Sequence, residues 1–279
     1  MASSSVQAVI LTGAIQAFLI MGLASVAVRL LKAPFPLSAL LLPVSLLLSY
    51  WLVYAKIPTF PPVGAVNKVP YVIAASTCVG LLCDSMKGPR LAIALSVSVV
   101  VLSAVYIAWN RLPEALPEVA LASIVGTVFV FGFRLRPEPA PAQYDVARSG
   151  AIGLAGLAAA PLAFLGASAS TLQLNLTFAA ATAAVLLPWL FGNRYRFTMP
   201  TLLGAAGGLF AVMCVVVLIT QKSDPVAISM LSVIGAAPYV SHRICQALGR
   251  QGAMALHVFS VGAACLCALA AYGFAYLAR

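Results

Sequence analysis

Charged side chains are scarce in this sequence, and acidic ones are the scarcest. Only 8% of the 279 residues are charged, with six Asp and Glu against sixteen Lys and Arg, whereas 63% are hydrophobic. A soluble domain carries roughly 25% charged residues, and so few charges could not cover the surface of a water-soluble protein of this size. High hydrophobicity also excludes a disordered chain. The composition therefore predicts an integral membrane protein.

Recognisable catalytic motifs are also missing. The sequence contains no P-loop, GxSxG, HExxH or Asp-rich prenyl-diphosphate motif, so an enzyme is the less favoured class, although the question stays open. The six cysteines form no CxxC and are too sparse for a disulfide scaffold. No loop has the length and the clustered basic and aromatic residues that nucleic-acid binding requires, so we expect no nucleic-acid partner.

Long apolar runs separate the short clusters of charge. A membrane-spanning helix needs roughly 17–25 apolar residues, and runs near this length predict an all-α polytopic bundle of about ten transmembrane helices. The expected spans are residues 6–28, 36–55, 69–84, 91–110, 118–133, 149–168, 171–191, 201–221, 226–242 and 253–277. Spans 118–133 and 226–242 are short, and each is alternatively a re-entrant or strongly buried element.

The distribution of basic residues sets the expected orientation. Cytoplasmic loops collect Lys and Arg. If the N-terminus lies outside, eleven of the sixteen basic residues fall in cytoplasmic loops. We therefore expect a multi-pass protein of a bacterial-type inner (plasma) membrane, with both termini on the periplasmic side.

A hydrophilic segment divides the chain into two equal sets of spans. Residues 134–148, RLRPEPAPAQYDVAR, are rich in proline and charge and predict a semi-rigid cytoplasmic linker. Residues 1–133 then form a first five-helix half and residues 149–279 a second half of one membrane domain. Because five is odd, the second half would be inverted relative to the first, as in many transporters. The alternative is ten unrelated spans with a linker between them.

Two loops on the expected periplasmic side carry opposite charges. Lys56 and Lys68 border a proline-rich segment, and Glu114 and Glu118 lie in the loop that follows the fourth span. These residues could form ion pairs across this mouth, although such pairs contribute only roughly 0–1 kcal/mol in water. No ionisable residue falls near the middle of any span, which argues against a proton-coupled transporter with a buried carboxylate.

Polar side chains within the spans are the candidates for a substrate path. An amide in hydrocarbon needs a partner, so Gln16, Gln173 and Asn175, with Thr177 nearby, either join helices or line a polar cavity. A glycine pair, Gly204 and Gly208, has the GxxxG spacing that lets helices approach closely. For this pair we expect packing within the molecule rather than dimerisation.

The only two histidines, His242 and His257, fall near one face of the membrane in adjacent spans. Two imidazoles on facing helices can hold a haem, and with Cys245 as a third ligand they would resemble a metal site. The competing interpretation is an interfacial histidine beside Arg243 and a core histidine bonded to a backbone carbonyl. We favour the latter and expect no cofactor.

These patterns favour a transporter or permease for a small neutral or lipophilic molecule. Its path would lie between the two halves and be lined by hydroxyl and amide side chains rather than by charges. The alternative is a non-catalytic structural or assembly subunit of a larger membrane complex, with small-residue faces and the proline-rich outer loop as contact surfaces. The expected partners are the lipid bilayer and, in the second case, other membrane subunits.

Overall fold

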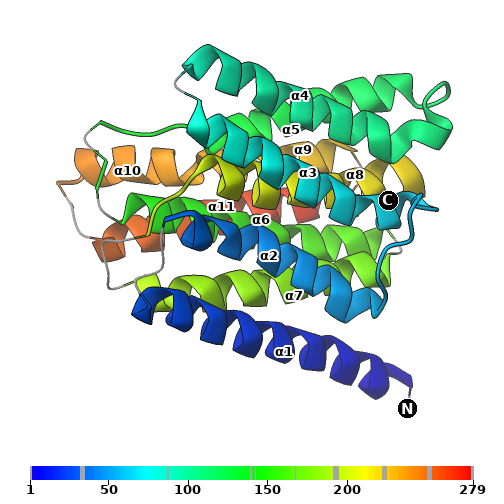
Figure 1. The fold of residues 1–279 in the computed structure, drawn as a ribbon, viewed down its shortest axis with the longest axis horizontal. Helices are drawn as coiled ribbons and strands as arrows, with labels where there is room; N and C mark the ends of the chain where they lie inside the picture. Colours follow the sequence, from blue (N-terminus) through cyan, green and yellow to red (C-terminus); the bar gives the residue numbers. More distant parts are fainter. Residues whose placement is uncertain are drawn as a thin grey trace.

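The computed structural model describes residues 2–31, 35–86, 88–138, 140–141, 143–166, 168–190, 195–221, 225–249 and 253–277, and every regular element in them is a helix. Most of the long helices run along a common direction and pack side by side (Figure 1). The expectation of an all-α chain is therefore confirmed.

The first half of the chain forms five helices. They are α1 (Ala2–Leu30), α2 (Phe35–Tyr54), α3 (Ala65–Ser85), α4 (Pro89–Ala108) and α5 (Leu116–Gly132). A short 3-10 turn, η1 (Trp109–Arg111), ends α4. Pro89 and Pro117 lie in the first turns of α4 and α5, where proline's missing N–H has no helical partner to lose.

The second half is less regular. It contains α6 (Tyr144–Leu165), α7 (Ala169–Leu186) with the 3-10 turn η2 (Leu187–Trp189), and α11 (Ala253–Leu277). Between them, α8 (Gly207–Cys214) continues at both ends as π-helix, in η3 (Thr201–Ala206) and η4 (Val215–Thr220). The next stretch is divided into α9 (Pro225–Ser232), the 3-10 turn η5 (Val233–Ala236) and α10 (Ala237–Ala247).

Eight helical stretches of the described chain are long and apolar enough to cross a membrane. The two remaining expected spans are the ones whose sequences are short. α5 has 17 residues, and residues 225–247 are interrupted by η5. At this interruption, two glycines let α5 and η5 approach closely. A Cβ on Gly235 would lie 2.5 Å from the Phe129 carbonyl oxygen, and a Cβ on Gly132 would lie 2.9 Å from the Ala236 nitrogen. The close crossing of α5 over η5 therefore depends on both glycines.

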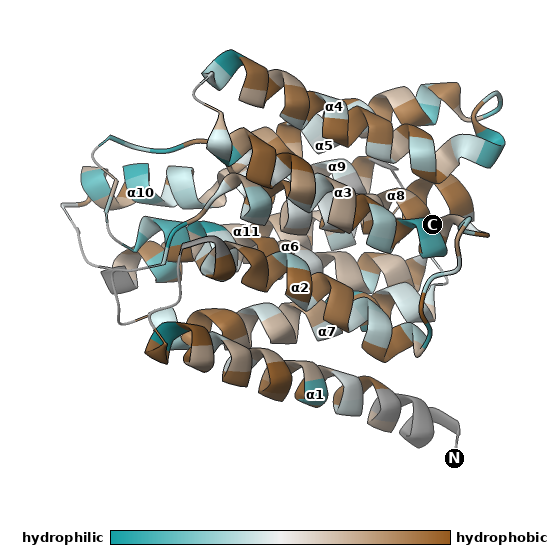
Figure 2. Ribbon diagram, in the orientation of Figure 1, coloured by the Kyte–Doolittle hydropathy of each residue, from teal (hydrophilic) through white to brown (hydrophobic). Residues whose placement is uncertain are grey.

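Hydrophobic residues cover the lengths of most helices, whereas α10 is largely hydrophilic, and other hydrophilic residues gather at helix ends and in the loops (Figure 2). Large apolar side chains point outward from α1 and α11, among them Leu23, which is 72% exposed, and Leu266, which is 70% exposed. Both marked chain ends lie at the same end of the bundle (Figure 1).

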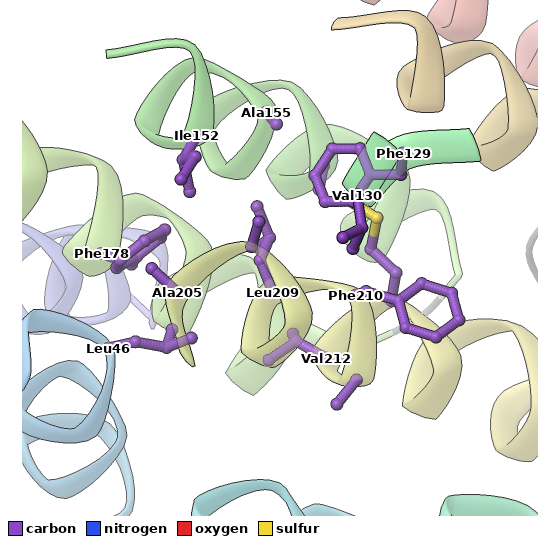
Figure 3. Close-up of a cluster of buried hydrophobic side chains, with 14 of the residues drawn as sticks. Leu46, Phe129, Val130, Ile152, Ala155, Phe178, Ala205, Leu209, Phe210 and Val212 are labelled. Atoms are coloured by element: carbon purple, nitrogen blue, oxygen red, sulfur yellow. The ribbon is translucent and has the colours of Figure 1, made fainter. Parts of the chain in front are cut away.

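The continuous helix formed by η3, α8 and η4 is the core of the bundle, because nearly all of its side chains are buried. Its Leu209 lies between side chains of neighbouring helices (Figure 3). Gly204 and Gly208 face α2 and α3: a Cβ on Gly204 would lie 2.3 Å from Thr77 Oγ1, and one on Gly208 would lie 2.7 Å from Ile73 Cγ1. The GxxxG pair therefore serves packing within the molecule, as predicted.

The boundary of the expected linker differs from the sequence expectation. Helix α6 begins at Tyr144, so the last five residues of the segment 134–148 are helical rather than extended, and Asp145 and Arg148 are buried. A buried charge needs a polar partner, and Arg148 finds one in the Phe133 carbonyl at the end of α5. Linker residues 139 and 142 lie outside the described residues.

Candidate functional site

An apolar groove runs between α5 and the central helix. On α5 it is lined by Glu118, Leu121, Ala122 and Val125. These residues are spaced i, i+3, i+4 and i+7, which places them on one face of a helix. With a rise of about 1.5 Å per residue, the stripe is about 10 Å long. Glu118 is in the first turn of α5, so it marks one end of the groove.

The central helix supplies a matching stripe. Phe210, Met213, Cys214 and Val217 line the opposite wall with the same spacing, and Ser229 of α9 completes the lining. At the inner end the Phe210 ring occupies the space over Gly126, where a Cβ would lie 2.4 Å from Phe210 Cε2. The groove therefore has a carboxylate at its mouth and apolar walls along its length.

The groove is narrow and open on one side. It encloses about 360 Å³ when the space at its open side is included, but its closed part has room for only about one or two water molecules. Leu121, on its edge, is 41% exposed. A slim chain would therefore lie along the open side of the groove, against its apolar walls, rather than inside the closed part.

Glu118 is half-buried, and its Oε2 atom is covered and has no hydrogen-bond partner. The expected pairing with Lys68 is not formed, since Lys68 Nζ donates to the Tyr106 carbonyl oxygen at 2.8 Å. Arg111 likewise donates from Nη1 to the Ile219 carbonyl oxygen at 3.4 Å. These two cations are engaged by backbone carbonyls, which leaves the Glu118 carboxylate facing the groove.

A second cavity adjoins the groove on the other side of the central helix. It lies between α6, α7, α8 with η4, and α9, and is lined by Ala159, Leu162, Ala163, Asn175, Met213, Val216 and Leu231. It leaves about 10 Å³ for the centre of a water-sized molecule, which is room for about one water. Asn175 is 1% exposed, and its Oδ1 atom has no hydrogen-bond partner.

Met213 lines both cavities, so its side chain stands between the carboxylate groove and the Asn175 cavity. Methionine has an unbranched, flexible side chain that adapts to irregular space. The helix that carries Met213 changes to π-helix at Val215, and single π turns inside helices are frequent at functional sites. Two unpaired oxygen acceptors thus lie on either side of one adaptable residue.

The candidate path residues from the sequence do not form one cluster. Gln173 and Thr177, four residues apart on α7, both face α1, since a Cβ on Gly13 would lie 3.5 Å from Gln173 Nε2 and 3.6 Å from Thr177 Oγ1. Asn175 lies on a different face of the same helix, at the second cavity. Gln16 is exposed on the outer side of α1.

The two histidines are half-buried on α10 and α11. The His242 ring meets Tyr144 edge-on with ring centroids 6.1 Å apart, and the Nε2 atoms of His242 and His257 have no hydrogen-bond partner. Within the described ranges, no three or more His, Cys, Asp or Glu residues are grouped so that they would hold a metal. The haem and metal alternatives remain untested.

Buried polar groups gather at the end of the bundle where α6 begins. Ser149 Oγ donates to the Tyr195 hydroxyl at 3.2 Å, and complete burial raises the pKa of Tyr195 to about 12. Burial also lowers the pKa of the Arg134 guanidinium, whose Nη1 atom has no hydrogen-bond partner. These groups lock helix ends together and lie apart from the residues that line the two cavities.

The fold and the two cavities define an all-helical bundle with eight helices long and apolar enough to cross a membrane. No protein-family model matches the chain, and no curated protein matches it in sequence.

Proposed function

We propose that the chain is a multi-pass protein of a bacterial-type inner membrane, with both termini in the periplasm. The eight long apolar helices, the outward-facing leucines of α1 and α11 and the hydrophilic helix ends (Figure 2) support a bilayer environment. The excess of basic residues in alternate loops supports the orientation.

Reporter fusions test this orientation. Alkaline phosphatase, which is active only in the periplasm, should be active when fused to the C-terminus and inactive when fused after Pro141 in the linker. A green fluorescent protein fused at the same two positions should give the reverse pattern. Phosphatase activity at Pro141 would overturn the proposed orientation.

Within this scaffold, we propose transport of a small neutral or lipophilic molecule. The observation that carries the proposal is the pair of cavities separated by Met213. A path would run from the groove at Glu118, past Met213, to the Asn175 cavity. Gln173 and Thr177 are then assigned to the contact between α1 and α7, and Asn175 is the polar group of the path.

Flux through proteoliposomes tests the proposal. The probes are erythritol, a neutral polyol, and decylguanidinium, a lipophilic cation whose permanent charge limits passive leakage. We expect the protein to accelerate the flux of at least one probe over that of protein-free liposomes. Asn175→Leu should slow this flux about tenfold, since the substrate loses a hydrogen bond of roughly 1–1.5 kcal/mol.

Gln16→Leu is the matched control, because it removes an amide from the exposed side of α1 and should leave the flux unchanged. Met213→Trp should block the flux by filling the space between the cavities. Acceleration of neither probe would overturn transport, and equal flux in Asn175→Leu and the unaltered protein would remove Asn175 from the path.

A structural or assembly subunit is the second candidate. The observation that favours it is the exposure of α11, on which Cβ atoms added at Gly262 and Gly273 would meet nothing within 4 Å. A partner helix could pack closely against such positions. Copurification of a stoichiometric membrane protein in mild detergent would support this candidate over transport. The partner should be lost in Gly262→Leu, and it should be retained in a control variant on α1 such as Leu23→Ala.

A further inference from the structure

We propose that the groove between α5 and the central helix binds a slim lipophilic cation that carries N–H donors, such as an alkylammonium or alkylguanidinium. The inference rests on the proposed transport function, because it names the chemical class of the substrate. Binding can nevertheless be measured without flux, so the two proposals can fail separately.

The first argument is the state of the Glu118 carboxylate. Its Oε2 atom is covered by protein and has no hydrogen-bond partner. A buried acceptor without a partner costs roughly 1–3 kcal/mol, and more when it is charged. The first turn of α5 holds Glu118 at the positive end of the helix dipole, which stabilises a carboxylate there. A ligand that donates N–H groups would remove the cost of the missing hydrogen bond.

The second argument is that no ion pair to Glu118 is found among the described residues, whose ranges leave out 222–224. The two basic side chains discussed above, Lys68 and Arg111, donate to the carbonyl oxygens of Tyr106 and Ile219. Among the described residues, the one ion pair is that of Arg148 with Asp145, which belongs to the end of the bundle where α6 begins. Within the described part of the chain, the negative charge of Glu118 is thus left for a ligand to balance.

The shape and lining of the groove give the third argument. Beyond Glu118 the walls are formed by Leu121, Val125, Phe210 and Val217, and burying each CH₂ of an alkyl chain against such walls contributes roughly 0.8 kcal/mol. The stripe of about 10 Å matches a chain of about eight to ten carbons. Across Met213, midway along the groove, Asn175 Oδ1 is a second unpaired acceptor that suits the same donor.

Equilibrium binding to the full chain in phosphatidylcholine nanodiscs tests the inference, with empty nanodiscs subtracted. Decylguanidinium should bind at least tenfold more tightly than decyltrimethylammonium, which has the charge but no N–H, and decanoate, which has the opposite charge, should not compete. Glu118→Gln should weaken decylguanidinium binding about tenfold or more, since a hydrogen bond to a charged group contributes roughly 1.5–3 kcal/mol. Glu114→Gln, which alters an exposed carboxylate in the loop just before α5, should bind like the unaltered protein.

A second pair of variants keeps the test valid if Glu118→Gln does not fold. Ala122→Phe fills the groove and should abolish binding, whereas Ala120→Phe places the same ring on the exposed side of α5 and should not. Equal affinity in Ala122→Phe and Ala120→Phe, or in Glu118→Gln and Glu114→Gln, would overturn the site. Loss of binding when phosphatidylethanolamine replaces phosphatidylcholine would assign the groove to a lipid headgroup and overturn the assignment to a free cation.

Flux measurements separate this inference from the proposed function. Charge-selective binding without acceleration of erythritol or decylguanidinium would leave the site standing and overturn transport. Acceleration of either probe, combined with binding that is indifferent to charge and to Glu118, would leave transport standing and overturn the cation site.

Discussion

Replacing Arg148 with methionine should lower the free energy of unfolding by about 3–5 kcal/mol, the usual cost of removing one partner from a buried ion pair. Arg148 is 6% exposed. Its Nε and Nη2 atoms donate to the Phe133 carbonyl oxygen, its Nη1 atom lies 3.4 Å from Asp145 Oδ1, and its guanidinium lies 4.0 Å from the centre of the Phe197 ring. One side chain thus joins the end of α5, the start of α6 and the segment before η3.

Unfolding in mixed micelles, followed by circular dichroism, measures this loss. Arg136→Met removes an exposed arginine of the same segment and should change stability by less than about 0.5 kcal/mol. Adding Asp145→Asn to Arg148→Met should recover part of the loss, because the uncompensated buried carboxylate is then removed. Equal stability of Arg148→Met and Arg136→Met would show that the buried contacts of Arg148 contribute nothing net.

The helices were predictable because hydrocarbon length and charge placement are strong constraints on a chain of this composition. Eight of the expected spans correspond to helices long and apolar enough to cross a membrane. The short spans 118–133 and 226–242 correspond to α5 and to the interrupted stretch from α9 to α10. The interruption depends on Gly235 meeting the Phe129 carbonyl, a contact between distant parts of the chain that no local pattern reveals. Crossing by these two stretches, and the inverted repeat, remain predictions.

The start of α6 was misjudged because Tyr144 to Arg148 read as a hydrophilic stretch continuous with the proline-rich segment. Polar residues usually indicate solvent, but here the Phe133 carbonyl, the Phe197 ring and Asp145 surround the guanidinium of Arg148. Burial of an arginine depends on partners that the tertiary structure supplies. Its sequence neighbours therefore did not indicate it.

The candidate site was predictable in part. Asn175 follows from the rule that an amide in hydrocarbon needs a partner or a polar cavity, and it does line a cavity. Glu118 and Met213 were missed as site residues. Glu118 was interpreted as a partner for an ion pair at the mouth, so it was not considered as a site residue. The apolar stripe that follows it, at Leu121, Ala122 and Val125, was visible in the sequence. Which side of α5 faces the central helix depends on Gly126 meeting Phe210, and that contact is not encoded locally.

Replacing Gly80 with alanine should destabilise the protein by about 1–3 kcal/mol, the usual cost of overpacking a core. A Cβ at this position of α3 would lie 2.6 Å from both the Cα and the nitrogen of Pro200 and 2.7 Å from the Met199 carbonyl carbon. These are backbone atoms, so no side-chain rotation can relieve the overlap. The same contact brings the Met199 N–H to Asp84, to which it donates at 3.2 Å. A displaced backbone would therefore weaken this hydrogen bond as well.

Gly262→Ala is the matched control, since a Cβ there would meet nothing within 4 Å. It should raise stability by up to about 1 kcal/mol, because alanine loses less conformational freedom in a helix than glycine does. The two alanine variants thus add the same methyl group to helices of one protein, and their expected effects on the free energy of unfolding have opposite signs. If Gly80→Ala unfolds at the same denaturant concentration as Gly262→Ala, the close approach of α3 to Pro200 is not a feature of the folded protein.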